Sequence, residues 1–528
     1  MYKSLRMVNM IKYPVGIQTF EKIIEGGYLY VDKTRYVHDL VNDNQYVFLS
    51  RPRRFGKSLL LSTIQAYFEG KRKLFAGLAV AGLEKAWDSY PVLRFDLSGE
   101  SYEHPAKLEC KLNLLLREYE DIYGKEEDEV SVGSRFRGII RRAVERTGRR
   151  AVILIDEYDK PLLETMHQEE LHESMRLQLR GFYSVLKESD EFIRFAMLTG
   201  VTKFGQVTVF SGLNNLRDIS MLDRYNEICG ISETEFRKYF AASVKDFAMA
   251  KGITEEKVWE LFRNNYDGYH FSETGCGMYN PFSVLNAFKD NRISNYWFRS
   301  GSPDYLIKLF KRNHYVLNEL EGQRRTESQL LDMTNPDRNV ITLLYQSGYL
   351  TIKDYDPMFE EYILGFPNNE VRTGFWSSLY DNYVFNGSNR TAFDMSRFVR
   401  DVFDGKATEF IERLQALIAS VSPGTLKDKE IYFQNILQVV FSMMGFYTRT
   451  EITMASGRAD MTVETEKYIY IFEFKIDSTA EAALAQIKGK RYSAPFNTGT
   501  HKVILIGANF SSTTNLLSDY IIEELSNS

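Results

Sequence analysis

The stretch Tyr46-Val-Phe-Leu-Ser50-Arg-Pro-Arg-Arg-Phe-Gly56-Lys57-Ser58 joins an apolar strand to a helix predicted over Leu59–Phe68. A strand, a loop ending in Gly-Lys-Ser and a helix form the context of a phosphate-binding loop, in which backbone amides receive phosphate oxygens. Lys57 would reach the β- and γ-phosphates, and the Ser58 hydroxyl would ligate Mg²⁺. The position of the first glycine is Arg51, so a basic turn before a helix is the alternative. The residues expected to hold ATP are Arg53, Arg54, Phe55, Gly56, Lys57, Ser58 and Asp156.

A second element lies about a hundred residues further along, where the aliphatic run 152–155 ends in Asp156-Glu157. This is the Walker B pattern, in which Asp156 holds Mg²⁺ through water and Glu157 polarises the attacking water as general base. The alternative is an aspartate that caps the next helix. Another strand ends at Thr199 and Thr202, either of which could sense the γ-phosphate, and a purely structural threonine is equally open.

Alternating apolar strands and helical stretches predict a parallel α/β sheet over the first 230 residues. In such sheets, ligands bind outside the carboxyl ends of the strands. The expected strands are Tyr46–Ser50, Val92–Leu97, Ala151–Ile155 and Phe192–Thr199, with Tyr225–Cys229 as a candidate fifth.

The middle of the chain is predicted to be mostly helical from Ser232 to Lys311. A helix over Val340–Gly348 and a hairpin of Tyr349–Lys353 and Glu361–Gly365 follow, which is how a winged-helix domain ends. That domain could contact DNA or serve as a packing or regulatory module. Asn386-Gly-Ser-Asn-Arg is expected to be a linker, so the predicted domains are residues 1–230, 231–385 and 386–528.

Near the C-terminus, a hairpin of strands Asp460–Glu464 and Tyr468–Ile476 carries charges where a buried strand should be apolar. Glu473 and Lys475 are two residues apart and leave the same face of their strand. A turn at 466–467 places Asp460 opposite Glu473, with Cβ atoms roughly 5 Å apart. A divalent cation would relieve the repulsion of two facing carboxylates, and Lys475 could serve a metal-bound water. An ordinary ion-pair cluster on a half-exposed hairpin is the alternative.

Composition narrows the classes of protein to which the chain could belong. The 528 residues have a net charge of −5, so bulk charge does not indicate a nucleic-acid partner. Three cysteines without CxxC spacing exclude a disulfide framework and a thiolate zinc site. The sequence has neither a signal peptide nor an apolar stretch of the roughly 18–20 residues that span a bilayer. A cytoplasmic protein without a membrane partner is expected.

Taken in order, these motifs resemble a bacterial AAA-ATPase-like family, whose loop also has Arg-Pro-Arg-Arg-Phe in place of the first glycine. The resemblance implies that Gly16–Phe20 and Tyr28–Thr34 frame the adenine, and it identifies no arginine finger beyond the weak candidate Arg217. The stretches that carry it are Gly16-Ile-Gln-Thr-Phe20, Tyr30-Val-Asp-Lys-Thr34, residues 51–58, Ile155-Asp-Glu-Tyr-Asp159-Lys-Pro161, Thr199-Gly-Val-Thr-Lys-Phe204, Asn214-Asn-Leu-Arg-Asp-Ile219, Asn280-Pro281-Phe282 and Tyr296-Trp297-Phe298.

The C-terminal hundred residues resemble the PD-(D/E)XK nuclease superfamily, on Asp460, Glu473-Phe-Lys475, and Gln486 with Lys490-Arg-Tyr492. The resemblance implies that Asp460 and Glu473 hold Mg²⁺, that Lys475 serves the water, and that Gln486 supports the site. Glu430 matches the acidic residue often found on the first helix of that core.

The leading hypothesis is an α/β protein in which a P-loop ATPase, through a helical and winged-helix middle, regulates a nuclease that cleaves nucleic acid with Mg²⁺. DNA is the favoured substrate, and a homo-oligomer is left open. The main rival is an ATP-gated switch that binds nucleic acid or a partner without cutting. A third option is an ATPase with a purely structural C-terminal domain.

Overall fold

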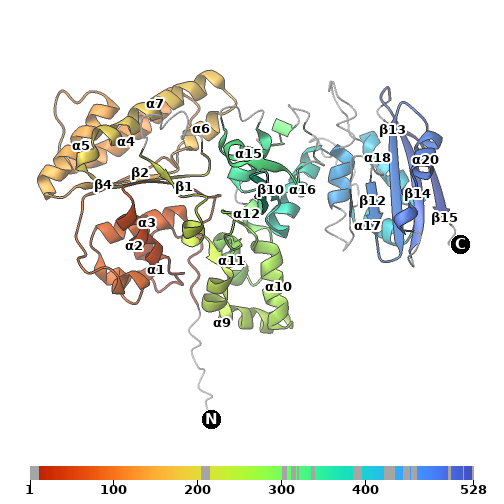
Figure 1. Cartoon of the computed structure of the whole chain (residues 1–528), viewed down its shortest axis with the longest axis horizontal. Helices are drawn as coiled ribbons and strands as arrows, with labels where there is room; N and C mark the ends of the chain where they lie inside the picture. Colours follow the sequence, from red (N-terminus) through yellow and green to blue (C-terminus); the bar gives the residue numbers. More distant parts are fainter. Residues whose placement is uncertain are drawn as a thin grey trace, which may run out of the picture. The chain divides into compact units, whose positions relative to one another are not determined.

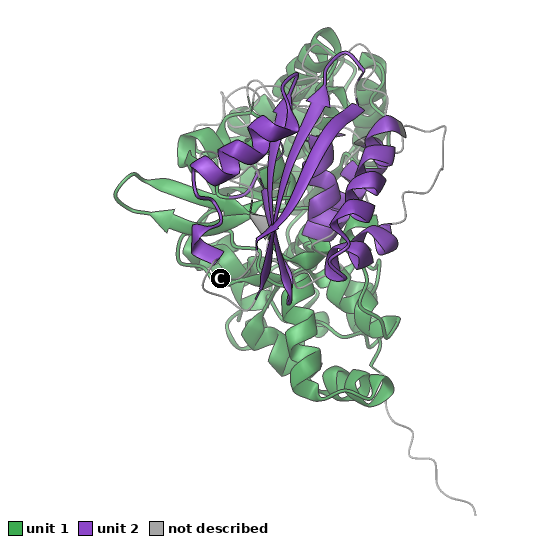
Figure 2. Cartoon of the chain, turned by 90° about the vertical axis from the view of Figure 1, so that its right-hand side faces the viewer, with its two compact units in different colours: residues 1–300, 322–371 green, residues 301–321, 372–528 purple. Residues whose placement is uncertain are grey.

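The computed structural model describes residues 11–203, 215–299, 306–307, 309–310, 315, 317, 320–333, 339–383, 395–420, 435–443, 452–453, 461–496, 501–514 and 516–525. The chain divides into two compact units, residues 1–300 with 322–371 and residues 301–321 with 372–528 (Figure 2). The finer division into three domains stays a prediction.

Unit 1 contains a five-stranded parallel sheet with the order β2-β3-β4-β1-β5. Every residue of β3 is buried, as expected of a parallel strand covered on both faces. The strands are β1 Tyr46–Ser50, β2 Val92–Asp96, β3 Ala151–Asp156, β4 Ile193–Gly200 and β5 Arg217–Asp218. The four strands predicted from the apolar runs are therefore confirmed.

The candidate fifth strand, Tyr225–Cys229, is wrong. This stretch belongs to a 3₁₀ helix, Asp223–Ile228, and β5 lies a few residues earlier in the chain. Tyr225 and Ile228 are both buried. Their spacing of three residues suits one face of a 3₁₀ helix, which buries two apolar side chains without a sheet partner.

Helices cover both faces of this sheet (Figure 1). One face carries α4 Pro105–Tyr123, α5 Val132–Thr147 and α7 Glu169–Glu188, and the other carries α1 Phe20–Glu25, α2 Thr34–Asp43 and α3 Lys57–Phe68. A short helix, α6 Lys160–Thr165, follows β3. The three layers confirm the α/β class and bring the carboxyl ends of β1, β3 and β4 to one edge.

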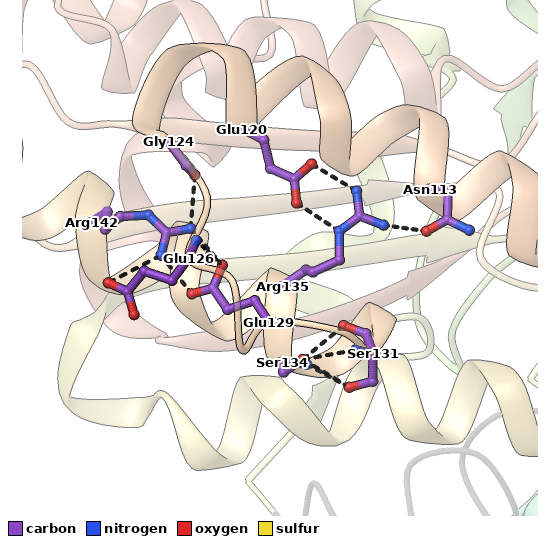
Figure 3. A network of polar contacts seen from close by, with 9 residues as sticks. All are labelled: Asn113, Glu120, Gly124, Glu126, Glu129, Ser131, Ser134, Arg135 and Arg142. Carbon is purple, nitrogen blue, oxygen red and sulfur yellow. Dashed lines mark hydrogen bonds and ion pairs between the residues drawn. The ribbon is translucent and has the colours of Figure 1, made fainter.

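An ion-pair network holds α4, the following loop and α5 together (Figure 3). Arg135 donates to both Glu120 carboxylate oxygens, at 2.6 and 2.7 Å, and also to Asn113. Arg142 donates to Glu129 at 2.5 and 2.9 Å, and to the Gly124 carbonyl at 2.8 Å. Because Glu120, Glu129 and Arg135 are nearly buried, these pairs fix the helical hairpin in one register.

The helical part of unit 1 has an aromatic core. Phe236, Phe262, Tyr279 and Phe288 pack with ring centroids 4.3 to 6.0 Å apart. Its elements are β6 Ile231–Ser232, α9 Glu233–Lys251, α10 Glu255–Tyr266, β7 Met278–Tyr279, α11 Pro281–Lys289 and α12 Tyr296–Arg299. Reciprocal bonds between Ser232 and Glu235 begin α9.

The predicted helix and hairpin near residue 350 are confirmed as elements. They are α15 Val340–Ser347, β9 Thr351–Asp356 and β10 Glu361–Gly365, preceded by β8 Arg324–Thr326 and α14 Glu327–Leu331. The three strands form an antiparallel sheet with the order β8-β10-β9. The assignment of this region as a winged helix stays a prediction.

Unit 2 contains a mixed five-stranded sheet with the order β11-β12-β13-β14-β15, in which β13 and β14 are parallel. The even-numbered residues Tyr470 and Phe472 of β13 pack on Phe410, and the odd-numbered Ile469 and Ile471 pack on α20. Helices therefore cover both faces (Figure 2). The elements are α16 Asn369–Tyr383, whose first three residues belong to unit 1, α17 Met395–Phe403, α18 Ala407–Ser420, β11 Ile452–Thr453, β12 Met461–Glu464, β13 Tyr468–Ile476, α20 Ala480–Gly489, β14 Lys502–Ser511 and β15 Leu516–Leu525.

Candidate functional site

The loop between β1 and α3 has two residues in the left-handed region of the backbone. Gly56, directly before α3, has φ +95°, which glycine adopts without steric cost. Arg54 also lies in the left-handed region, at φ +68°, where non-glycine residues are uncommon. The Lys57 ammonium donates to the carbonyls of Arg51 and Pro52, at 2.9 and 3.2 Å. The charge of Lys57 is thus held within the curve of the loop.

Arg51 occupies the position of the missing glycine and has a structural role. Its side chain is 2% exposed, and it donates to the carbonyls of Ser220 and Tyr225 at 2.7 and 3.1 Å. The guanidinium carbon lies 4.1 Å from the centroid of the Phe271 ring. Burial lowers the pKa of Arg51 to about 10. Arg51 therefore anchors the loop from behind and does not line the cavity described below.

Asp156, at the end of β3, is 1% exposed and lies between the phosphate loop and β4. The Thr199 hydroxyl donates to Asp156 Oδ1 at 2.8 Å, and the Ser58 side chain also hydrogen-bonds to this carboxylate. Arg94 Nη2 lies 3.5 Å from Asp156 Oδ2. Burial raises the pKa of Asp156, and the bonds from Ser58 and Thr199 oppose that rise. Oxygen donors from Ser58 and Asp156 are the kind of ligand that Mg²⁺ takes.

Asp159, three residues later, performs a different task. It accepts hydrogen bonds from the Val201 and Thr202 amides and from the Thr202 hydroxyl, the last two at 2.6 Å. Burial raises the pKa of Asp159 to about 6. The Thr202 hydroxyl is thus committed to this turn, whereas Thr199 faces Asp156. Of the two candidate sensor threonines, only Thr199 lies at the Walker B carboxylate.

A cavity of about 490 Å³ opens beside the loop. It is named the nucleotide cavity, after the ligand that the motifs predict. Its volume lies in the range of small-molecule and cofactor sites. Glu157, which has φ +54°, lines it together with Lys57 and Ser58. Its lining also includes Pro14, Gly16, Gln18, Arg53, Arg54, Lys160, Pro281, Phe282 and Leu285.

The expected adenine frame divides between two cavities. Residues 14–18 line the 490 Å³ cavity, whereas Leu29, Tyr30, Val31 and Lys33 line a smaller apolar cavity of about 90 Å³. Gly56 and Leu59 border both. The assignment of either wall to the base stays a prediction.

The large cavity carries more positive than negative side chains. Arg53, Arg54, Lys57 and Lys160 line it, against Glu157 and Glu164. The Arg54 guanidinium carbon lies 4.9 Å from the centroid of the Phe282 ring. Arg217, the weak candidate for an arginine finger, donates to Asn44 Oδ1 at 2.9 Å and is outside the cavity lining.

In unit 2, the hairpin of β12 and β13 has the predicted register. The facing pairs run from Met461↔Phe472 to Glu464↔Ile469, as a turn at 466–467 requires. Glu473 is 1% exposed. Lys475 Nζ lies 3.0 Å from Glu473 Oε1 and 2.7 Å from Gln486 Oε1 on α20. The structure thus brings together Glu473, Lys475 and Gln486. Asp460 and Glu430 lie outside the described residues, so their roles as metal ligands stay predictions.

Glycine at position 507 lets α20 reach this site. Gly507 of β14 pairs with Glu473 in the parallel register. A Cβ at this position would lie 2.5 Å from the Ala480 carbonyl oxygen and 2.7 Å from the Leu484 nitrogen. Only a residue without a side chain allows α20 to pack closely enough to present Gln486.

Sequence reasoning did not assign a role to three residues near the nucleotide cavity. Phe282 and Trp297 belong to motifs that were noted, but their partners are far away in sequence. Trp297 Nε1 donates to the Arg53 carbonyl at 2.9 Å. Arg94 belongs to no recognised motif. Its position as a charged residue within an apolar strand, Val92–Asp96, is the one sequence feature that could have drawn attention to it.

Fold and motifs define an AAA-ATPase-like protein with a PD-(D/E)XK nuclease superfamily domain near its C-terminus. Residues 14–210 match the family model of predicted AAA-ATPases, and residues 428–519 match that of the PD-(D/E)XK nuclease superfamily. The chain is 35% identical over 530 residues to a protein of Azotobacter chroococcum mcd 1 named "Uncharacterized protein in vnfD 5'region". The alignment covers 97% of this chain and 99% of that relative. The chain therefore belongs to this AAA-ATPase-like family.

Within the part of the chain that the structure describes, no helix is both long and apolar enough to cross a membrane.

Proposed function

We propose that unit 1 binds and hydrolyses ATP with Mg²⁺ and that the C-terminal domain cleaves phosphodiester bonds in nucleic acid. The observation that carries the first part is a cavity of about 490 Å³ lined by Lys57, Ser58 and Glu157, with the Asp156–Thr199 pair next to Ser58. The second part rests on the trio of Glu473, Lys475 and Gln486 in a nuclease-superfamily domain.

In the ATPase site, each side chain has a task that its position supports. Lys57 and the loop amides bind the phosphates, and Ser58 and Asp156 are the residues that hold Mg²⁺. When bound, Mg²⁺ neutralises phosphate charge. Glu157 orients the attacking water and accepts its proton. Thr199 fixes the orientation of the Asp156 carboxylate through their hydrogen bond.

In the nuclease domain, Glu473 and Asp460 are the proposed ligands of a divalent cation, with Glu430 as a further acidic ligand. A cation in that place stabilises negative charge on the phosphate. Lys475 orients the attacking water. Gln486 holds Lys475 in place, since its Oε1 accepts from Lys475 Nζ at 2.7 Å.

The ATPase assignment is tested by measuring phosphate release by the purified chain in the presence of Mg²⁺. Lys57→Ala should lose both nucleotide affinity and turnover, because the loop loses its main phosphate ligand. Glu157→Gln should still bind ATP but turn over at least roughly 100-fold more slowly, because it lacks the general base. Normal turnover in both variants would contradict the assignment.

The nuclease assignment is tested with plasmid, linear DNA and RNA, with and without ATP, in Mg²⁺ or Mn²⁺. Lys475→Ala should abolish cleavage while ATP hydrolysis survives. DNA is the expected substrate. Tight binding of DNA by the wild type without cleavage in either metal would instead favour the ATP-gated switch.

A further inference from the structure

Trp297 contacts the phosphate loop through its indole nitrogen. The residue is 5% exposed, and Nε1 donates to the Arg53 carbonyl at 2.9 Å. Indole has a single hydrogen-bond donor, so this contact satisfies the side chain in a buried place. Arg53 lies between Pro52, whose carbonyl accepts from Lys57, and Arg54, whose backbone is left-handed. A change in the loop's backbone on binding phosphate would therefore move the acceptor of Trp297.

Glu370 accepts a hydrogen bond from α12 and lies beside α11, the helix that lines the nucleotide cavity. Its Oε1 accepts from the backbone nitrogen of Trp297 at 2.7 Å, and the Ser283 side chain and the Tyr296 backbone lie near enough to lower its pKa. Ser283 follows Phe282, which lines the cavity. Glu370 is only 1% exposed, and burial raises its pKa to about 8. A buried carboxyl that accepts from α12 and lies beside α11 is sensitive to a shift of either helix.

The helix that carries Glu370 continues into unit 2. Glu370 lies in the first turn of α16, Asn369–Tyr383, and the boundary between the two units falls after Val371. The start of this helix is held in unit 1, since Asn368 accepts from the Val371 amide and donates to the Asp267 carbonyl. A rotation or shift of the first turn is thus carried along one continuous helix.

We propose that Trp297 and Glu370 are positioning residues that link the phosphate loop to α16, so that nucleotide occupancy regulates the activity of the C-terminal domain. This inference rests on the proposed function, because it names the regulation of that site. The link has two hydrogen bonds, from the Trp297 indole to the loop and from the Trp297 amide to the first turn of α16. A tryptophan that merely fills the core would give no nucleotide-dependent signal.

The first experiment follows tryptophan fluorescence of the full chain, which contains four tryptophans. A non-hydrolysable ATP analogue with Mg²⁺ should change the emission of the wild type. Trp297→Phe should lose this change, because phenylalanine has no indole. Trp259→Phe is the matched control: this ring contacts Arg237 and packs on the helical core, so the variant should keep the change.

Calorimetry with the same analogue distinguishes a failure of the proposed ATPase function from a failure of the proposed link. If the wild type does not bind the analogue, the proposed ATPase function fails. If it binds and the emission is unchanged, or if Trp297→Phe retains the full change, the link is wrong.

The second experiment measures the ratio of cleavage rates with and without the analogue, or of DNA affinities if the wild type binds without cutting. The wild-type ratio should differ from one by roughly 5-fold or more, a usual size for coupling between sites. Trp297→Phe and Glu370→Leu should bring it close to one. Glu370→Gln should rescue it, since an amide oxygen still accepts from the Trp297 amide. A wild-type ratio of one, or an unchanged ratio in Trp297→Phe, would overturn the proposal.

Discussion

At the scale of single residues, two buried aspartates three positions apart do different work. Asp156 ends β3 and receives the side chains of Thr199 and Ser58, which come from other elements. Asp159 accepts three bonds from residues 201 and 202 and so shapes the turn after β4. Asp156 is bonded to a residue that lines the nucleotide cavity, Ser58, whereas Asp159 bonds to the turn after β4.

Substitutions of Thr199 and Thr202 test whether Asp156 and Asp159 have these different roles. Thr199→Val removes the donor to Asp156 while keeping the shape of the side chain, so ATP turnover should fall by roughly 10- to 100-fold, with a higher Mg²⁺ requirement. Thr202→Val removes one of three donors to Asp159, so the main effect should be lower thermal stability, by about 1–3 kcal/mol. Phosphate release as a function of Mg²⁺ concentration and thermal unfolding together distinguish the two. Equal losses of turnover without loss of stability would contradict the assignment.

Most residues of the proposed ATPase site belong to short motifs whose spacing reflects one strand, one loop or one helix start. Lys57, Ser58, Asp156 and Glu157 were all proposed from the sequence for this reason. The choice between Thr199 and Thr202 was not predictable, since both follow the same strand and only the fold decides which faces Asp156. Arg94 was missed for a similar reason: its partners are brought to it by parallel strand pairing.

At the scale of elements, the C-terminal hairpin shows what pattern alone can predict. A turn at 466–467 determines the register, and the pairs from Met461↔Phe472 onward follow it. The packing of α20 was not predictable, because it depends on Gly507, which lies on a different strand and far along the chain. The strand β5 was also missed. Two residues are too few for a periodic signal.

The hairpin of α4 and α5 offers an element-scale prediction at Gly138. A Cβ there would overlap the carboxylate of Glu129, which is nearly buried and paired with Arg142. Alanine gains up to about 1 kcal/mol of helix propensity over glycine. Breaking a buried ion pair costs about 3–5 kcal/mol. Gly138→Ala should therefore destabilise unit 1 by about 2–4 kcal/mol, measured by thermal or urea unfolding.

Gly181 in α7 is the matched control. It is exposed, and a Cβ would meet no atom within 4 Å. Gly181→Ala should therefore be neutral or slightly stabilising, through helix propensity alone. If Gly138→Ala behaved like Gly181→Ala, Glu129 would have to move without loss, and the network of Figure 3 would not clamp the hairpin.

At the scale of the whole molecule, the order of motifs predicted an ATPase-like part followed by a nuclease-like part, and both family matches agree. The contacts between segments that are distant in sequence could not be predicted. Trp297 and Arg53 are 244 residues apart, and Trp297 and Glu370 are 73 apart. No local pattern predicts which buried carboxyl will meet which amide over such separations.

Glu370 gives the whole-molecule prediction, because its proton should make stability depend on pH. Burial raises its pKa from 4.5 to about 8 in the folded chain. Between these values the folded state holds a proton that the unfolded state has released, so stability falls as pH rises through this window, by at most about 1.4 kcal/mol per pH unit. Glu370→Gln has no such proton.

The melting temperature of Glu370→Gln should be close to that of the wild type at pH 5 and exceed it increasingly up to pH 8.5. Glu127→Gln, an exposed glutamate of the same unit, serves as the control and should follow the wild type throughout. A difference between Glu370→Gln and the wild type that stays constant from pH 5 to 8.5 would show that Glu370 is charged in the folded chain.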